Sequence, residues 1–303
     1  MQIVGGEAVR DVVSLTAARE AVHDAFCALA EGTVVAPDEF TMLLANGGEL
    51  HVKGAHLGGP YFAFKSASGQ FPEGGNSGFS VVLSSSTGAP VVIIDDGGWL
   101  TEIRTAAASA VSARALARPE STRLAILGGG FQAAFQVAAL REAFAIESVS
   151  AWSRTAATTE RFAGENDAVA AGTVAAAVAD ADIVICCTPS REPLLDMDML
   201  RPGAHVIAMG ADVAGKRELS DDVVTGCDLL VADQIEITSK VGELAHVPSE
   251  RDRCVELGDV LTGRAVDRTA PDQITVSDHC GLGIQDAAMA QLVMEAIAGG
   301  DSA

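Results

Sequence analysis

One stretch decides the fold of this chain, Leu124-Ala-Ile-Leu-Gly-Gly-Gly-Phe-Gln-Ala133, in which four residues of apolar type lead into three glycines. The apolar residues predict a short buried strand, and Phe135–Leu140 after the turn has the apolar spacing of a helix. In this setting Gly128 would allow a tight turn, Gly130 would let the backbone approach a pyrophosphate, and the small Ala133 would let helix and strand pack closely. The helix N-terminus would also present unpaired N–H groups to phosphates. The pattern therefore predicts a dinucleotide-binding unit and favours it over an ordinary glycine turn.

Composition limits the classes of partner. The chain has 303 residues, enough for two domains, and 49% of them are hydrophobic, so a large core can be buried. The formal net charge is −21, and a field of this sign repels nucleic acids and anionic membranes, so we expect neither as a partner. The charge itself fits a solubility adaptation. A small anionic ligand would need local cations, and lysine occurs only at Lys53, Lys65, Lys216 and Lys240.

The cysteines and the start of the chain indicate a compartment. No two of the six cysteines have the spacing of a Cys-x-x-Cys motif. This usage is typical of a reducing environment, so we expect neither a disulfide framework nor a metal site. The first residues do not have the pattern of a signal peptide, and no apolar run is long enough to cross a bilayer. The expected location is the cytoplasm.

The first hundred residues predict a helix followed by a sheet. Residues 15–31 have the pattern of an amphipathic helix that ends at Gly32. After it, short apolar segments alternate with glycine-rich turns, which predicts a mostly antiparallel layer. The predicted strands are Thr41–Ala45, Glu49–His56, Tyr61–Ser66, Gly78–Ser84 and Val91–Asp95.

Two of the four lysines lie on consecutive predicted strands. Alternation puts Lys65 on the same face as Tyr61 and Ala63, so a fully solvated position is not expected for it. An exposed strand lysine is the alternative interpretation for Lys53 and Lys65. A cation beside a cleft would hold a substrate carboxylate, and both lysines are therefore candidate substrate-binding residues.

An alanine-rich helix follows, with Thr101 as its predicted N-cap. Arg104 falls in the first turn of this predicted helix, where a cation opposes the helix dipole. A cation at this position is best explained by an anion that Arg104 holds. The polar segment Arg118–Thr122 after the helix predicts a crossing between domains.

The second predicted strand of the nucleotide unit, Ser148–Trp152, ends in Ser153-Arg154-Thr155. An acidic residue at this strand end would bind the ribose hydroxyls of NAD, whereas Ser153 and Arg154 offer a hydroxyl and a guanidinium to a 2′-phosphate. This strand end therefore favours NADP(H) over NAD(H).

Two later strands of the unit also end in polar loops. The strand Ala181–Cys187 opens into a loop that begins at Thr188, and a strand that ends at Gly210 is followed by Asp212 and Lys216. Ligands bind at the carboxyl ends of parallel strands. The alternative interpretation of Asp212 and Lys216 is an ordinary ion pair within the loop. His205, inside its strand, is expected to be packed rather than catalytic.

Taken together, these segments resemble the ornithine cyclodeaminase/mu-crystallin family. The resemblance rests on motifs that follow one another along most of the chain. They are Asp95-Asp-Gly-Gly-Trp-Leu-Thr-Glu-Ile-Arg-Thr-Ala-Ala-Ala-Ser-Ala110, Gly128-Gly-Gly-Phe-Gln-Ala133, Thr188-Pro-Ser-Arg-Glu-Pro193, Gly203–Leu219 and Gly281-Leu-Gly-Ile-Gln-Asp286.

The resemblance implies an α/β protein with a split layout and a homodimeric assembly. Residues 118–277 would form an NAD(P)-binding Rossmann domain with a doubly wound parallel sheet. Residues 1–117 and 278–303 would form a mixed α+β domain for substrate binding and dimerisation, built from the N-terminal strands and a C-terminal helix.

The resemblance also implies roles for single residues. Lys65 would bind the substrate carboxylate, and Asp212 would be the acid/base at the reacting carbon. Contacts to the cofactor would come from Arg104, which would also contact substrate, and from Thr105, Gly128, Gly130, Gln132, Ala133, Ser153, Arg154, Thr155, Thr188, Gly210 and Lys216.

The family chemistry implied is hydride transfer at the α-carbon of an amino acid, which leaves an imine. A second amine of the same substrate then closes a ring and releases ammonia, as in the cyclisation of ornithine or lysine. Without such an amine, the same site would be an amino-acid dehydrogenase or a reductase of cyclic ketimines. A non-enzymatic NADPH-dependent binder of mu-crystallin type is a further alternative.

Two departures from the family pattern concern the substrate. Cyclodeaminases of the family have an arginine about two dozen residues before the position of Lys65, where this chain has Thr41 or its neighbours. Lys53 is the candidate for the missing cation. Its predicted strand would also place Glu49 and His51 near the site. The family segment Phe-Lys-Ser is replaced here by Ser277–Cys280, so His279 is a further candidate substrate-binding residue.

Overall fold

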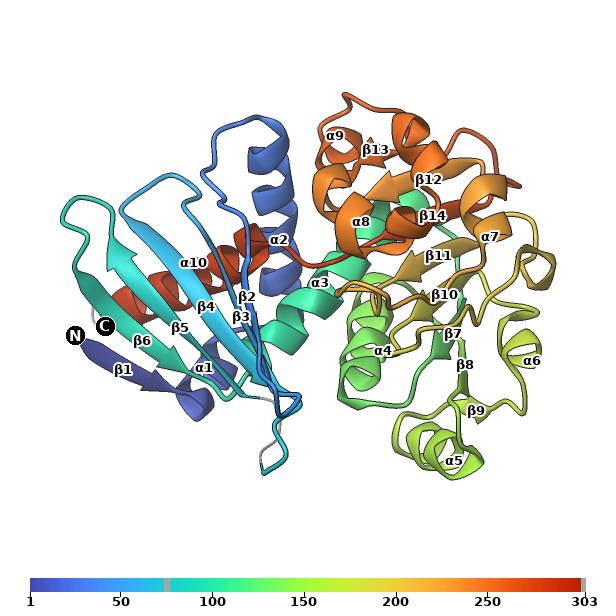
Figure 1. Ribbon diagram of the computed structural model, residues 1–303, viewed down its shortest axis with the longest axis horizontal. Helices are drawn as coiled ribbons and strands as arrows, with labels where there is room; N and C mark the ends of the chain where they lie inside the picture. The colour runs from blue at the N-terminus through green and yellow to red at the C-terminus, as the bar shows by residue number, and fades with distance from the viewer. Residues whose placement is uncertain (74–76, 301–303) are drawn as a thin grey trace. The chain divides into compact units, whose positions relative to one another are not determined.

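The computed structural model describes residues 1–73 and 77–300. The chain divides into two compact units (Figure 1): unit 1 contains Met1–Ala108 and the chain from Leu282 onward, and unit 2 contains Ser109–Gly281. The division falls inside the helix α3 (Trp99–Leu116) and not at Arg118–Thr122. The assignment of substrate binding to one unit and of the nucleotide to the other stays a prediction.

Among the described residues, unit 1 holds a six-stranded sheet with the strand order β1-β6-β5-β4-β3-β2. The strands β1 and β6 are parallel, and all other neighbours are antiparallel. The predicted antiparallel layer is confirmed, and β1 is an addition to it. The strands are β1 Gln2–Gly5, β2 Phe40–Leu43, β3 Glu49–Ala55, β4 Tyr61–Gly69, β5 Ser77–Ser84 and β6 Pro90–Asp95.

Helices cover one face of this sheet. The C-terminal helix α10 (Gly283–Gly300) packs against α2 (Leu15–Ala30) and against β3 and β4 (Figure 1). The short helix α1 (Gly6–Val12) follows β1 and contacts β6. Side chains on the covered face, such as Val82 and Ile94, are almost fully buried. The burial of this face and of α10 forms the core of unit 1.

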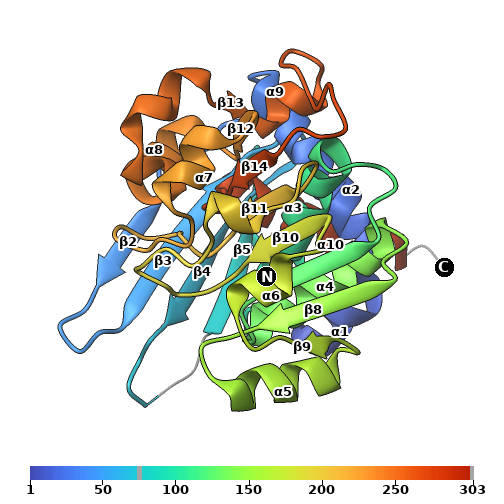
Figure 2. The same ribbon diagram turned by 90° about the vertical axis from the view of Figure 1, so that its right-hand side faces the viewer.

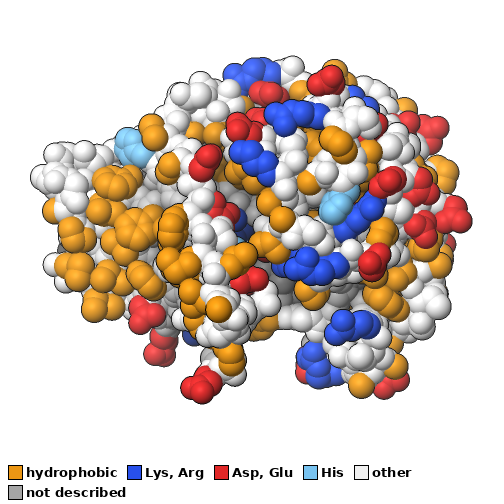
Figure 3. Space-filling view, viewed as in Figure 1, with side chains coloured by type: hydrophobic (Ala, Val, Ile, Leu, Met, Phe, Trp, Pro, Cys, Tyr) orange, Lys and Arg blue, Asp and Glu red, His pale blue; other side chains and the backbone are white. Residues whose placement is uncertain are grey.

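The opposite face of the sheet is also apolar, although no helix of unit 1 is packed on it. Ile3 and Phe79 alternate with buried positions of their strands, whereas Phe40 and Met42 lie on β2, which is exposed along its length. The four side chains are between 42% and 67% exposed. We call this surface the outer sheet face. Figure 3 shows the hydrophobic side chains that gather on it. A patch of this kind marks an interaction surface more often than a solvated one.

Unit 2, which is described throughout, is built on an eight-stranded parallel sheet with the order β13-β12-β14-β11-β10-β7-β8-β9. Figure 2 shows these strands running side by side. The first strand, β7, lies inside the sheet, with the next two strands on one side of it and the later ones on the other. The strands are β7 Arg123–Leu127, β8 Ser148–Trp152, β9 Val169–Ala170, β10 Ile183–Cys186, β11 His205–Ala208, β12 Leu229–Ala232, β13 Val255–Glu256 and β14 Thr275–Asp278.

Apolar clusters lie on both faces of the parallel sheet. One cluster joins Ile126 and Ile185 to the helices α3, α4 and α5, and the other joins Leu127 and Val206 to α6 and α7. The prediction of a doubly wound α/β fold with a second, mixed domain is therefore confirmed. The helices of unit 2 are α4 Phe131–Ala143, α5 Ala156–Glu165, α6 Val174–Val178, α7 Asp221–Gly226, α8 Ile235–Val241 and α9 Leu257–Leu261, with 3-10 turns at Met197–Met199, Glu243–His246 and Pro248–Arg253.

The start of α3 differs from the prediction. The helix begins at Trp99, so Thr101 is inside it and Arg104 lies in the second turn. The carboxylate of Asp96 accepts the backbone N–H of Leu100 at 2.5 Å and that of Gly98 at 3.4 Å, so Asp96 takes the capping role that was predicted for Thr101.

Along the described residues, none of the helices combines the length with the apolar character that a membrane crossing needs.

Candidate active site

A pocket of about 330 Å³ lies at the carboxyl ends of β7, β8 and β10 in unit 2. Three glycines form one wall, and the second wall comes from the loops after β8 and β10. The lining residues are Gly128, Gly129, Gly130, Trp152, Ser153, Arg154, Thr155, Thr158, Cys187, Thr188, Pro189, Ser190 and Leu194. This is the place where a doubly wound sheet binds a dinucleotide.

The glycine turn has the geometry that a pyrophosphate requires. Gly128 has a φ of +134°, and a Cβ on it would lie 2.8 Å from the carbonyl oxygen of Cys187, so only glycine fits. A Cβ on Gly130 would meet nothing within 4 Å, which leaves open space next to the backbone. No side chain caps the first turn of α4, so its N–H groups are oriented for an anionic ligand. These residues fit a nicotinamide dinucleotide.

The predicted phosphate selectors lie at the end of β8. Ser153 Oγ is 3.2 Å from the carbonyl oxygen of Thr155 and 2.9 Å from Thr159 Oγ1, and both contacts fix the turn. Arg154 is exposed, lines the pocket, and forms no ion pair with a described residue. Its guanidinium is therefore available to an anion of the ligand.

A fully buried carboxylate, Glu218, ties two loops at this edge of the sheet. One oxygen accepts the backbone N–H of Thr188 at 2.6 Å and the Thr188 hydroxyl at 2.7 Å, and the other accepts the N–H of Gly210 at 2.7 Å. Burial raises the pKa of Glu218 to about 7, although these three donors oppose the shift. Thr188 and Gly210 are held in place by one side chain.

Asp212 and Lys216 follow Gly210 in the chain. Lys216 Nζ lies 2.6 Å from Asp212 Oδ1, so the ion pair that was the alternative interpretation is present. Asp212 is about half exposed and Lys216 mostly covered. An exposed pair of this kind is weak, and the Asp212 carboxylate can therefore exchange this partner for a ligand.

In unit 1, Lys53 and Lys65 stand directly opposite each other on β3 and β4. Lys65 is 5% exposed, as the alternation of its strand predicted. Its Nζ lies 3.0 Å from Asp286 Oδ1, and Nε of Arg104 lies 3.2 Å from the same oxygen. Arg104 also donates to Gln285 Oε1 at 3.0 Å. The anion that Arg104 was expected to hold is thus supplied by α10, and two buried cations share one carboxylate oxygen.

Burial dominates the electrostatics of this group. It lowers the pKa of Lys65 to about 8, although Asp286 opposes the shift. Burial also acts to raise the pKa of Asp286, but Lys65 and Arg104 outweigh it and hold that pKa below its usual range. The second oxygen of Asp286 is buried without a hydrogen-bond partner among the described residues. The cations Lys65 and Arg104, which also interact with Glu102, would attract a further carboxylate.

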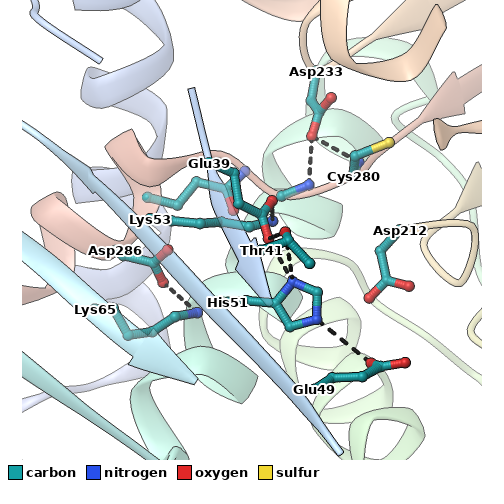
Figure 4. Close-up of polar contacts among 12 residues, drawn as sticks. Glu39, Thr41, Glu49, His51, Lys53, Lys65, Asp212, Asp233, Cys280 and Asp286 are labelled. Atoms are coloured by element: carbon teal, nitrogen blue, oxygen red, sulfur yellow. Dashed lines mark hydrogen bonds and ion pairs between the residues drawn. The ribbon is translucent and has the colours of Figure 1, made fainter. Parts of the chain in front are cut away.

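A second charged cluster lies on the same side of the sheet (Figure 4). His51 Nδ1 is 2.5 Å from Glu39 Oε1, His51 Nε2 is 3.5 Å from Glu49 Oε2, and Lys53 Nζ is 2.9 Å from Glu39 Oε2. The contact with Glu39 raises the pKa of His51. Thr41 stands opposite His51 on β2. The position of the family arginine is therefore next to a histidine whose pKa is raised by contacts with two carboxylates.

Four other predicted contact residues differ in their surroundings. The side chain of Ala133 lies in the core beneath α4, so any contact with a phosphate would come from its backbone N–H. Gln132 and Thr105 are half-buried on α4 and α3.

His279 is fully buried in unit 2, and neither ring nitrogen has a hydrogen-bond partner among the described residues. Burial lowers the pKa of His279 to about 3, so the ring is neutral. His205 is packed against Thr275, as expected.

The sequence prediction missed Glu39, Glu218 and Asp286. Glu218 and Asp286 lie inside motifs that carried the family resemblance, but no role was assigned to either residue. The available signal for Asp286 was a carboxylate in the first turn of an otherwise apolar helix.

Residues 3–301 match the model of the ornithine cyclodeaminase/mu-crystallin family. The chain belongs to this family. An alanine dehydrogenase of Archaeoglobus fulgidus is 31% identical over 97% of this chain and 94% of its own length. A protein of Sinorhizobium fredii named as an uncharacterized cyclodeaminase is 35% identical over 97% of this chain and 95% of its own.

The fold comparison agrees with the family. The structure of an archaeal alanine dehydrogenase dimer with bound NAD superposes with a TM-score of 0.91 at 28% identity, covering 99% of this chain and 96% of that one. Further relatives in the family are named ornithine cyclodeaminase, ketimine reductase mu-crystallin and iminosuccinate reductase. The prediction of an enzyme of the cyclodeaminase, imine reductase and dehydrogenase group is confirmed.

Proposed function

We propose that this family member transfers a hydride at the α-carbon of an amino acid with NAD(P), and that its net reaction is the deaminating cyclisation of a diamino acid such as ornithine or lysine. The observation that carries the proposal is the pair of buried cations, Lys65 and Arg104, which share a single oxygen of Asp286. Two cations that share one carboxylate oxygen are suited to a further carboxylate, and every α-amino acid supplies one.

The nucleotide would bind to unit 2 at the pocket of the glycine turn. Its pyrophosphate would meet Gly128, Gly130, Gln132 and the N–H of Ala133, and Thr188, Gly210 and Lys216 would contact its other half. Thr105 and Arg104 are proposed as further contacts. When bound, the nicotinamide supplies the acceptor and the donor of the hydride.

The protein residues would then handle carboxylate, protons and the second amine. Lys65 and Arg104 would hold the α-carboxylate, with Lys53 and His279 as further substrate contacts. Asp212 would take the proton from the α-amino group as hydride leaves the carbon, and would return protons as ammonia leaves. Glu49 accepts from Gln70 at 2.8 Å on Oε1, and its Oε2, which lies 3.5 Å from His51 Nε2, offers an acceptor to a side-chain ammonium. Attack of that second amine on the imine carbon closes the ring and expels the first nitrogen as ammonia. Return of the hydride to the resulting cyclic imine gives the cyclic amino acid with no net change of the nucleotide.

A reductase of cyclic ketimines or an amino-acid dehydrogenase is the second candidate. It is favoured by the alanine dehydrogenase and imine reductases among the relatives. In that case hydride stays on the nucleotide or on the substrate, and the reaction changes the nicotinamide in proportion to the product.

One assay separates these reactions. The protein is incubated with ornithine, lysine, alanine and cyclic imines under NAD(H) and NADP(H), and ammonia and nicotinamide absorbance are followed together. Cyclisation predicts ammonia release with no net absorbance change. Asp212→Asn should lower the rate by about 10²–10⁴-fold, because it removes the proposed acid/base. The control is Asp221→Asn, which removes an exposed carboxylate of the same unit and should leave the rate unchanged.

An Asp212→Asn rate within severalfold of the wild type would contradict the acid/base role. Stoichiometric absorbance change would replace cyclisation by the second candidate. Nucleotide binding without turnover of any substrate would leave a binder of the mu-crystallin type.

The pKa of Lys65 predicts a pH dependence. This pKa is lowered by burial to about 8, so the lysine is a cation below pH 8 and loses its proton as the pH rises through 8. We expect kcat/KM for an amino acid to fall by about tenfold per pH unit above that point. Lys65→Arg stays cationic at pH 10 and should remove this fall, which separates it from titration of the substrate amine. A profile that is identical in both proteins would rule out the role of Lys65.

The choice between the two nucleotides is predicted to depend on Arg154. We propose a preference for NADP(H), because Arg154 lines the pocket, is exposed, and is placed at the end of β8 where a 2′-phosphate lies. Arg154→Ala should weaken NADPH binding by about tenfold more than NADH binding, as measured by calorimetry. Arg141→Ala, an exposed arginine outside the pocket lining, is the control. Equal losses for both nucleotides would refute the preference.

We also propose a homodimer in which a second copy covers the outer sheet face. The family neighbour with bound NAD is a dimer, and the outer sheet face leaves Phe40 and Phe79 between 42% and 55% exposed. Phe40→Glu with Phe79→Glu should give a folded monomer in analytical ultracentrifugation, since buried apolar area drives such contacts. Val266→Glu, at an exposed apolar residue of unit 2, should stay dimeric. A double variant that remains a dimer would exclude this face.

A further inference from the structure

We propose that Glu218, as a carboxylate, is a positioning residue that fixes the loops after β10 and β11 and thereby determines the affinity for the nicotinamide half of the nucleotide. The inference rests on the proposed function in one respect, the binding of NAD(P) to unit 2. It assigns a role to a side chain that contacts neither substrate nor nucleotide.

The side chain of Glu218 joins the starts of two loops. Their later parts are linked by backbone hydrogen bonds, from the Arg217 N–H to the Ser190 carbonyl oxygen and from the Leu194 N–H to the Glu218 carbonyl oxygen. Thr188 lies two residues after β10, and Gly210 lies two residues after β11. Glu218 receives two hydrogen bonds from Thr188 and one from Gly210, all between 2.6 and 2.7 Å. A Cβ on Gly210 would overlap the carbonyl oxygen of Thr188 and lie 2.6 Å from Glu218 Cδ. The carboxylate therefore occupies the space between the loops and holds them close together.

The strand order decides which half of the nucleotide is affected. The pyrophosphate site after β7 lies between β8 on one side and β10 with β11 on the other. The adenine-side ribose binds at the end of β8 in such a sheet, so the nicotinamide half extends over the loops of β10 and β11. Thr188 lines the pocket on that side. Glu218 therefore acts on the reactive half and not on the adenosine half.

A second buried carboxylate of unit 2 provides the contrast. Asp182 precedes β10 at the opposite edge of the sheet, where it accepts the backbone N–H of Thr122 and Arg123 at 3.0 Å. It also pairs with the side chains of Arg118, Arg123 and Arg201. Glu218 has no ion pair with a described residue. Asp182, at the edge away from the pocket, is thus surrounded by cations. Glu218, at the edge that carries the pocket, is held by neutral donors alone.

The groups that face Glu218 make its charge sensitive to pH. Glu243 accepts the backbone N–H groups of Glu218 and Leu219 at 2.7 and 3.1 Å, Cys186 lies close on β10, and Asp212 lies in the adjoining loop. The neighbouring cations Lys216 and Arg217 are paired with Asp212 and Asp221. No opposite charge compensates the buried carboxylate, so it takes up a proton near pH 7 and then loses an acceptor for one of its donors.

The test compares ligands that contain or lack the nicotinamide half. Calorimetry measures the binding of NADH and ADP-ribose, and of NADPH and 2′-phospho-ADP-ribose, to the full chain. Glu218→Gln keeps the size but places an NH₂ group against a backbone N–H. It should weaken NADH or NADPH by about tenfold or more and change the matched ribose ligand by less than about threefold. Asp182→Asn is the matched control and should lower Tm without changing the ratio of the two affinities.

The wild-type protein gives a second measurement that does not depend on how a variant folds. Between pH 6 and pH 8.5, affinity for NADH or NADPH should rise with pH while that for the matched ribose ligand stays level, and Glu218→Gln should abolish the difference. A flat wild-type ratio, or equal weakening of both ligands in Glu218→Gln, would overturn the role of Glu218. Binding of neither nucleotide to the wild type would instead overturn the proposed function, and this inference with it.

Discussion

Backbone N–H groups at the carboxyl edge of the parallel sheet need acceptors, and buried carboxylates supply them. Glu218, Glu243, Asp233 and Asp278 each accept backbone N–H groups in the loops that leave this edge. A buried carboxylate is unfavourable unless it is hydrogen-bonded, so each loop is fixed by the need to satisfy one. The shape of the nucleotide pocket and the placement of Asp212 follow from this constraint.

The same balance between desolvation and pairing governs unit 1. Lys65 and Arg104 lose their hydration on burial, and Asp286 with Gln285 returns only part of it. Two buried cations in this setting would attract an anion. Under the proposed function, unit 1 would recognise the substrate through buried charge, while unit 2 would recognise phosphate through backbone shape.

The sequence predicted those features that depend on local periodicity. The alternation of β4 placed Lys65 on a covered face, and the order of apolar strand, glycine turn and helix identified the pocket around Gly128. It could not predict that Arg104 would meet Asp286, because the two residues are 182 positions apart and only the tertiary fold brings them together. Glu218 was missed for a related reason. A glutamate between two basic residues and a leucine resembles a solvated loop until the neighbouring strands bury it.

The covering helix of unit 1 also has a consequence for biosynthesis. The strands β1 to β6 leave the ribosome first, but α10, which carries the counterion of Lys65 and Arg104, is translated only after the whole of unit 2. The nascent sheet would have to wait without α10, while unit 2 is continuous and can fold meanwhile. Such a delay would leave the apolar strands of unit 1 open to pairing with other chains until α10 is made.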